Sequence, residues 1–184
     1  LNSSGYPDES LLLCCCRIES LGSSLYWRPE EESAAKNFVR ILREYGGEEV
    51  LWHIHPQQLI KSLQERVPKL YRLVGDRLRA TLASDEHVLR SPSELAALLD
   101  RVLTRNELEQ LNQQLWRGTI ASLVYSHLRS PLVHGPGAVP LLLSKATLHG
   151  APVPALDFEL LFPPLCRILS YAKRISVTSN SFYG

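Results

Sequence analysis

Apolar residues recur every three to four positions along most of the chain, which is the spacing of one face of an α-helix. This pattern predicts helices over residues 11–25, 30–45, 56–63, 68–78 and 156–177. Pro56 and Pro68 support two of these starts, because proline fits the first turn of a helix. Gly46 and Gly47 are expected to end the second helix, since glycine readily adopts the backbone conformation that follows a helix.

Two capping boxes predict further helix starts. In Ser91-Pro92-Ser93-Glu94 and in Thr104-Arg105-Asn106-Glu107, a hydroxyl residue stands three positions before a glutamate. Each of the two side chains can then bind a backbone N–H that the new helix leaves unsatisfied. The first box predicts a helix over residues 95–103. The second predicts a long helix whose apolar face continues to Val124.

The pattern changes from helical to extended at two places. Residues 50–55 form a short apolar stretch, and residues 139–143 and 146–148 are expected to pair as a hairpin, with a proline-containing loop over 150–154. We therefore expect a mostly α fold, a helical bundle of at least five helices with a short β-hairpin between residues 138 and 149. No linker or internal repeat interrupts the chain, so a single domain over residues 1–184 is expected.

Composition and charge exclude several classes of protein. Hydrophobic residues make up 45% of the 184 residues and charged residues 21%, which excludes intrinsic disorder. The 20 basic and 19 acidic residues leave a net charge of +1, so no overall field favours a nucleic acid or an acidic membrane. The apolar stretch 11–16 is too short to span a membrane and lacks a basic flank before it, so neither a membrane anchor nor a secretory signal is expected.

The cysteines do not have the spacing of a zinc or redox site, because Cys14, Cys15 and Cys16 are adjacent and Cys166 is far away. The three adjacent cysteines are expected to be small apolar side chains of a buried helix, in a protein of the reducing cytoplasm. The pair His53 and His55 would place two imidazoles on one face of a strand. It is either a metal chelate or part of a local turn beside Pro56.

Basic residues are concentrated in two segments. Residues 66–79 carry five of them and fit either a solvated helix or a surface for RNA. The last helix carries Arg167, Lys173 and Arg174 and no acidic residue from Leu160 onward, which a helix dipole would also explain. Glycine-rich phosphate loops and the HExxH and GxSxG motifs are missing from the sequence.

The most informative stretch is SLVYSHLRSPLVHGPG, residues 122–137, in which four residues separate Arg129 from His134. This spacing resembles the Rx4-6H signature of the HEPN superfamily (higher eukaryotes and prokaryotes nucleotide-binding), in an uncharacterised bacterial branch. The order of elements is also similar: the arginine closes a long helix, Gly135 follows the histidine, and a short extended insertion precedes the last helix. The resemblance covers at most residues 104–177.

The resemblance implies a helical core at about residues 104–177, with the helices of residues 11–103 packed on it. It also implies a homodimer of a defence or toxin type that cleaves RNA without a metal or a cofactor. Arg129 and His134 would be catalytic, with Ser130 and Tyr125 in support. Arginine suits the phosphate because its charged fork holds two oxygens, and histidine suits proton transfer near neutral pH. A cognate partner protein is not identified by the sequence.

The sequence departs from the family pattern directly after the arginine. Ser130 stands where members usually have Asn, Asp or His, and Pro131 is expected to end or kink the helix inside the motif. Two functions therefore remain open. One is a metal-independent endoribonuclease that acts on single-stranded RNA, and the other is a catalytically silent module that binds nucleotide, RNA or a protein.

Overall fold

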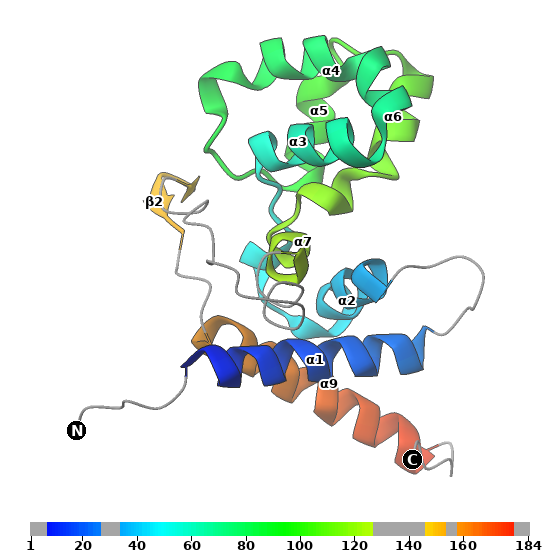
Figure 1. Ribbon diagram of the computed structural model, residues 1–184, viewed down its shortest axis with the longest axis vertical. Coiled ribbons are helices and arrows are strands. Elements are labelled where there is room, and N and C mark those ends of the chain that lie inside the picture. Colours follow the sequence, from blue (N-terminus) through cyan, green and yellow to red (C-terminus); the bar gives the residue numbers. More distant parts are fainter. Residues whose placement is uncertain (1–6, 27–33, 127–145, 154–157, 179–184) are drawn as a thin grey trace. The chain divides into compact units, whose positions relative to one another are not determined.

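The computed structural model describes residues 7–26, 34–126, 146–153 and 158–178 (Figure 1). The fold is mostly α-helical with a short antiparallel β-hairpin, which confirms the expected fold class. Contacts along the chain divide the described residues into two compact units, which we call unit 1 (residues 7–26, 34–48, 124–126 and 158–178) and unit 2 (residues 49–123 and 146–153). The expected core at 104–177 includes residues of both units, and the single domain stays a prediction.

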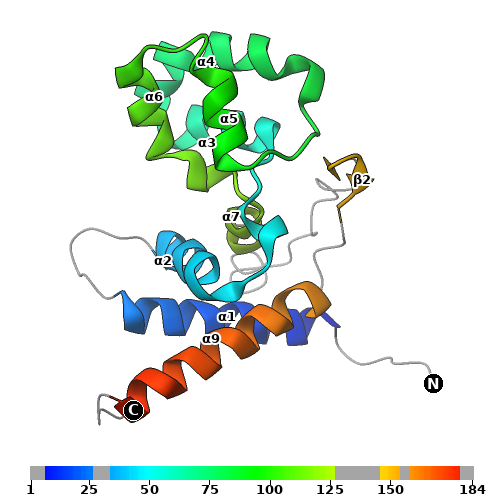
Figure 2. The same cartoon turned by 180° about the vertical axis from the view of Figure 1, so that it is seen from behind.

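Unit 1 is built from α1 (Pro7–Leu25), α2 (Ala34–Ile41), the π-helical turn η1 (Leu42–Gly46) and α9 (Phe158–Thr178). Helix α1 packs against both α2 and α9 (Figures 1 and 2). The buried face of α1 follows the helical period, with Leu11, Cys14, Cys15 and Ile18 against the other helices. Gly22 allows a close approach to α2, because a Cβ at this position would lie 2.9 Å from the backbone oxygen of Asn37.

The cysteines of unit 1 occupy different environments. Cys14 and Cys15 are buried as expected, whereas Cys16 is half-buried and Cys166 is exposed. All four are free thiols. Burial raises the pKa of the Cys14 thiol, and the neighbouring Cys166 adds to this effect. Cys14 is therefore a weak nucleophile at neutral pH.

Unit 2 is a helical bundle around one apolar core. Its long helices are α3 (Pro56–Arg66) and α4 (Pro68–Leu82), each with proline in its first turn. The shorter ones are α5 (Pro92–Leu99) and α6 (Arg105–Asn112). Short 3-10 turns lie between them: η2 (Glu49–Trp52), η3 (Ala83–Asp85) and η4 (Leu115–Gly118). Leucines from α3, α4, α5 and α6 meet in the core, including Leu59, Leu63, Leu78, Leu95 and Leu111.

Both capping boxes form as expected. Ser91 and Thr104 each accept a hydrogen bond from the backbone N–H of the glutamate three residues later, and each glutamate side chain accepts one in return. The helices they begin are shorter than expected. The helix after Ser91 ends at Leu99, and the long helix expected to reach Val124 ends at Asn112.

The break in the long helix has a physical cause at Gly118 and Thr119. A Cβ on Gly118 would lie 2.7 Å from Leu59 Cβ, so the chain approaches α3 closely at this point. Thr119 is then extended and begins α7 (Ile120–Val124), where its hydroxyl accepts a hydrogen bond from Ser122 N at 3.2 Å. Packing of η4 on α3 thus interrupts a sequence pattern that would otherwise continue as one helix.

The hairpin lies later in the chain than expected. Strand β1 (Thr147–Leu148) pairs with β2 (Ala151–Pro152), in the register Thr147 to Pro152 and Leu148 to Ala151. His149 and Gly150 form the turn with φ of 52° and 81°, as a tight antiparallel hairpin requires. The expected loop over 150–154 thus contains the second strand, while residues 139–143 lie outside the described residues.

The stretch over residues 50–55 is also corrected. Its first half is the helical turn η2, and only Ile54 forms isolated β-bridges, with Arg90 and Thr119. Within the described ranges, no helix has both the length and the apolar composition that a membrane span requires.

Candidate functional site

Tyr125 is the member of the expected site that the structure describes, and Arg129, Ser130 and His134 lie outside the described residues. The Tyr125 hydroxyl donates to Glu19 Oε1 on α1 at 3.3 Å. Its ring packs against Phe38 on α2, with 5.3 Å between the ring centroids and 55° between the planes. Tyr125, itself in unit 1, therefore contacts two helices of that unit. These contacts suit a positioning role better than stacking on a substrate.

A network of tyrosines and a glutamate lies in the same unit. The Tyr26 hydroxyl donates to Glu44 at 2.5 Å, and Arg40 binds the other oxygen of that carboxylate at 2.9 Å. Tyr45 donates to the Tyr171 hydroxyl at 2.9 Å, and these two rings stack with centroids 3.8 Å apart. The network joins α9 to η1.

The electrostatics of this network keep the hydroxyls of Tyr26 and Tyr45 protonated. Burial, and then the hydrogen bond to Glu44, raise the pKa of Tyr26. The hydrogen bond to Tyr171, with burial, raises the pKa of Tyr45 to about 12. Burial opposes ionisation of Glu44, but the hydrogen bonds from Tyr26 and Arg40 outweigh it and lower the pKa of this carboxyl. These groups can donate and accept hydrogen bonds, and the tyrosines are unsuited to act as bases near neutral pH.

A surface cavity of about 500 Å³ lies beside the stacked tyrosines, and Arg167 and Arg174 contribute to its lining. Arg167 Nε donates to the backbone oxygen of Gly46 at 2.5 Å, and its guanidinium also pairs with Glu48. The Arg174 guanidinium lies 5.5 Å from the Tyr171 ring centroid. The guanidinium of Arg167 is thus already bound by the Gly46 carbonyl and the Glu48 carboxylate.

Histidines of unit 2 form two edge-to-face pairs. His53 faces His149 and His55 faces His87, each with 6.0 Å between ring centroids. The two imidazoles of the His53-Ile54-His55 stretch therefore have different partners. His53 Nδ1 hydrogen bonds to the backbone oxygen of Glu49 at 3.0 Å. Among the residues described, no group of three or more His, Cys, Asp or Glu could hold a metal ion.

His55 is the most unusual of these histidines. It is 2% exposed, and neither of its ring nitrogens has a hydrogen-bond partner in the described part of the chain. Burial, and then the nearby His87, lower the pKa of His55 to about 4. His55 is therefore neutral near pH 7.

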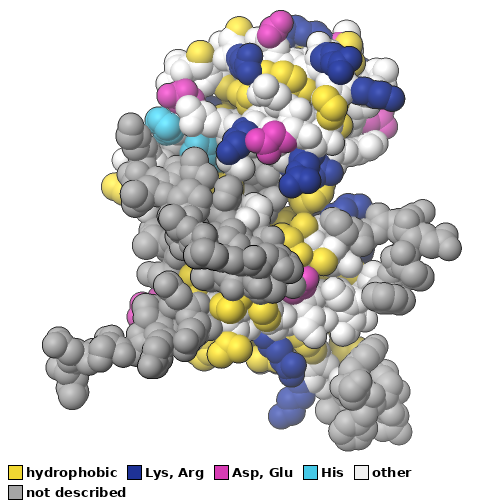
Figure 3. All heavy atoms as spheres, viewed as in Figure 1, with side chains coloured by type: hydrophobic (Ala, Val, Ile, Leu, Met, Phe, Trp, Pro, Cys, Tyr) yellow, Lys and Arg dark blue, Asp and Glu magenta, His cyan; other side chains and the backbone are white. Residues whose placement is uncertain are grey.

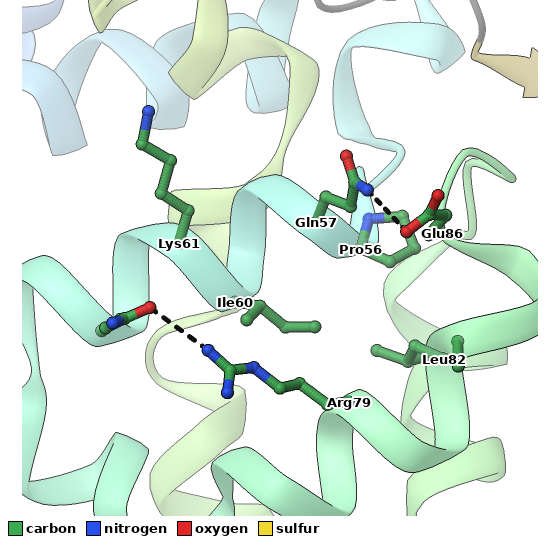
Figure 4. Close-up of a pocket in the computed structure, with 9 residues that line it drawn as sticks. Pro56, Gln57, Ile60, Lys61, Arg79, Leu82 and Glu86 are labelled. Atoms are coloured by element: carbon green, nitrogen blue, oxygen red, sulfur yellow. Dashed lines mark hydrogen bonds between the residues drawn. The ribbon is translucent and has the colours of Figure 1, made fainter.

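A second cavity, of about 490 Å³, lies between α3 and α4 in unit 2 (Figure 4). Gln57 donates to Glu86 at 2.6 Å on one side, and Arg79 binds Gln64 at 3.5 Å on the other. Figure 4 shows Ile60 and Leu82 pointing toward one another between these two pairs. Because these polar side chains already bind each other, the cavity does not present a converging set of free catalytic groups.

The basic segment over residues 66–79 divides between structural and surface roles. Arg77 forms two hydrogen bonds with Glu107, at 2.6 and 3.0 Å, and lowers the pKa of that buried carboxyl to about 2. Arg79 lies 5.2 Å from the Tyr71 ring centroid. On the face drawn in Figure 3, the Lys and Arg side chains of the α3 to α6 region lie among Asp and Glu. The Arg77–Glu107 pair was not expected, because nothing in the sequence signals a contact between α4 and α6.

Comparison of the chain with protein-family models, with curated proteins and with solved structures gives no match.

Proposed function

We propose that the chain is a HEPN-like, metal-independent endoribonuclease that cleaves single-stranded RNA with Arg129 and His134. The observation that carries this proposal is the spacing of these two residues in its context. The arginine comes four residues after Tyr125, and Gly135 directly follows the histidine. An arginine and a histidine together supply the two functions that RNA cleavage needs, a fixed positive charge and a group that transfers protons near neutral pH.

In the proposed reaction, the ribose 2′-oxygen attacks the adjacent phosphorus in line with the departing 5′-oxygen. The bond from phosphorus to the 5′-oxygen breaks, leaving a 2′,3′-cyclic phosphate and a 5′-hydroxyl. His134 takes the proton of the 2′-hydroxyl, and a proton is returned to the departing 5′-oxygen by the same imidazole or by His134 of the second motif in the cleft. Arg129 holds the nonbridging oxygens as their negative charge grows, and Ser130 donates a hydrogen bond to the phosphate.

The contacts of Tyr125 support one part of this proposal, namely that the chain before Arg129 is held in place. Its hydrogen bond to Glu19 and its packing on Phe38 hold the chain shortly before the motif. A phosphate-binding arginine contributes most when its place is fixed before the substrate arrives, since no energy is then lost in reorganisation. Tyr125 would supply part of that rigidity as a positioning residue.

A single arginine and a single histidine make half of such a site, so the proposal includes a homodimer that joins two motifs in one cleft. Closed two-fold symmetry is the most frequent way for identical chains to make such a contact. Sedimentation at tens of micromolar is expected to show a dimer. A monomer at that concentration would contradict the shared site.

The test of the proposed reaction uses labelled single-stranded RNA and detects cyclic-phosphate ends. His134→Ala should remove nearly all cleavage, and Arg129→Ala should lower the rate by a factor of about 10²–10³. His149→Ala is the matched control, because His149 is exposed at the hairpin turn and should leave the rate unchanged. Added EDTA should have no effect. Equal cleavage by wild type and His134→Ala would show that this histidine does not act in the reaction.

The departure at Ser130 and Pro131 favours a second candidate function. A proline inside the motif restricts the residue before it to an extended backbone, which changes how Arg129 and His134 approach each other. A chain altered in this way would bind RNA or nucleotide without cleaving it. Binding of RNA without cyclic-phosphate products, across varied sequences, would select this function.

A further inference from the structure

Helices α1 and α9 enclose a groove of about 460 Å³ in unit 1. Figures 1 and 2 show the two helices diverging toward their carboxyl ends. The residues that line the groove belong to the carboxyl-terminal halves of both helices. Leu21 on α1 and Leu169 on α9 provide apolar surface within it. Arg17 and Lys173, one from each helix, also line it and are both exposed. The groove therefore combines apolar surface with two cations.

Among the described residues, no carboxylate balances the charge of this groove. Its lining contains no acidic residue, and neither Arg17 nor Lys173 has a carboxylate partner in the part of the chain that the structure describes. Arg167, on the same helix as Lys173, pairs with Glu48 instead. Two unpaired cations in one groove favour an anionic ligand, since they would otherwise repel each other.

Serine hydroxyls add a second kind of binding group to the groove. Ser24 donates its hydroxyl proton to the Ser20 backbone oxygen at 2.9 Å, and Ser176 donates to that of Ala172 at 3.0 Å. Because these protons are already used, the hydroxyl oxygens of Ser24 and Ser176 remain as acceptors. An anion such as sulfate has no proton to donate to them. A ribonucleotide does, through its 2′-hydroxyl and the amino groups of its bases.

We infer that the α1–α9 groove binds single-stranded RNA, with phosphates on Arg17 and Lys173 and with ribose or base against Leu21 and Leu169. This inference rests on the proposed function, because it places part of the substrate strand of that reaction. Its residues are distinct from Arg129 and His134. Binding in the groove and cleavage at the motif can therefore be measured separately.

The experiment measures binding of a 2′-O-methyl oligoribonucleotide by fluorescence anisotropy over a range of salt concentrations. The probe cannot be cleaved, because methylation removes the 2′-hydroxyl nucleophile. The amino groups of its bases remain as donors to Ser24 and Ser176. The test variant is Arg17→Gln/Lys173→Gln. Its matched control, Arg43→Gln/Arg101→Gln, removes the same charge from exposed positions outside the groove. Circular dichroism tests whether both variants keep their helices.

The test variant should bind about tenfold more weakly near 0.1 M salt. The slope of log affinity against log salt should decrease by about 1.4, since each phosphate contact on a single strand contributes about 0.7. The control should stay within about twofold of wild type, with an unchanged slope. Equal losses in both variants would show an effect of net charge alone, and unchanged binding by the test variant would show that the groove is not used. Either result overturns the inference.

Further outcomes separate this inference from the proposed reaction. If the groove variant loses affinity while His134→Ala still cleaves RNA, the groove stands and the assignment of His134 fails. If the wild type binds phosphatidylserine vesicles through Arg17 and Lys173 but does not bind the probe, the inference fails. Should the double variant lose helical structure, the exposed Lys173→Gln carries the test alone, with a slope change of about 0.7.

Discussion

At the scale of single residues, His55 connects the stability of unit 2 to pH. Its imidazole is 2% exposed and faces His87, and burial is the main cause that lowers its pKa to about 4. In the unfolded chain the same group has a pKa of about 6.5. Between these values the unfolded chain binds a proton that the folded chain does not. The free energy of unfolding therefore decreases as the pH falls through this window.

We expect wild type to lose about 2.4 kcal/mol of unfolding free energy from this group between pH 7 and pH 4.5, because its pKa is about 4 in the folded chain and about 6.5 in the unfolded chain. His55→Leu should remove most of this dependence, because leucine buries a similar volume without an ionisable group. Urea unfolding at pH 7, 5.5 and 4.5 measures the difference. The pKa of Glu107 is lowered from 4.5 to about 2, so its own contribution begins to decrease near pH 4.5. This loss is the same in both proteins, and the difference between them therefore reports on His55. Parallel pH profiles for the two proteins would contradict the assignment.

At the scale of elements, the two capping boxes differ in the contacts that their glutamate side chains make outside the cap. In the first box, the Glu94 carboxylate accepts from Ser91 N at 2.8 Å. In the second box, the Glu107 carboxylate accepts from Thr104 N at 2.8 Å and also binds Arg77 of α4. The cap of α6 therefore contributes to the packing of α6 on α4, and the cap of α5 contributes mainly to its own helix.

Thr104→Ala should therefore destabilise unit 2 more than Ser91→Ala does. A lost cap costs about 1 kcal/mol in either case, and Thr104→Ala should approach about 2 kcal/mol because Glu107 also loses the hydrogen bond that orients it toward Arg77. Urea midpoints of both variants at pH 7 provide the comparison. A larger loss for Ser91→Ala would show that the α4–α6 contact does not depend on the cap.

The same elements show how far the sequence could predict the structure. Pro56, Pro68 and the two capping boxes act within one turn of their own position, and the starts of α3 to α6 were predicted from them. The break before Thr119 was missed because its cause, the contact of Gly118 with Leu59, involves two distant segments. The second strand was missed because its two residues are too few to show a periodic pattern.

The candidate site was predicted only in part for the same reason. The basic character of α9 is visible in the sequence, but the position of Lys173 beside Arg17 depends on the packing of α1 against α9. Tyr125 was expected near the site, and its contacts with Glu19 and Phe38 could not be inferred from local spacing. Local signals predicted elements, and contacts between distant elements decided which side chains meet.

At the scale of the whole molecule, the division into two units raises the question of whether unit 2 can fold by itself. The residues of its main apolar cluster, from Ile54 to Leu115, lie in the continuous stretch 49–123, and Ala146 is a buried side chain of the unit outside that stretch. The β1 strand adds two backbone hydrogen bonds, from Leu89 N to Thr147 O at 2.8 Å and from Thr147 N to His87 O at 3.0 Å. These bonds stabilise one edge of the unit and do not contribute to its apolar core.

We therefore expect a fragment of residues 49–123 to fold alone, with a helical circular dichroism spectrum and a single cooperative urea transition. A domain of this size has a free energy of unfolding of only a few kcal/mol. Leu78→Ala, at a fully buried position of α4, should cost about 2–5 kcal/mol and unfold the fragment. Leu73→Ala on the same helix is the matched control, because Leu73 is 49% exposed and its loss should change stability little. A fragment without a cooperative transition would instead favour one domain over residues 1–184, in which unit 2 requires the rest of the chain to fold.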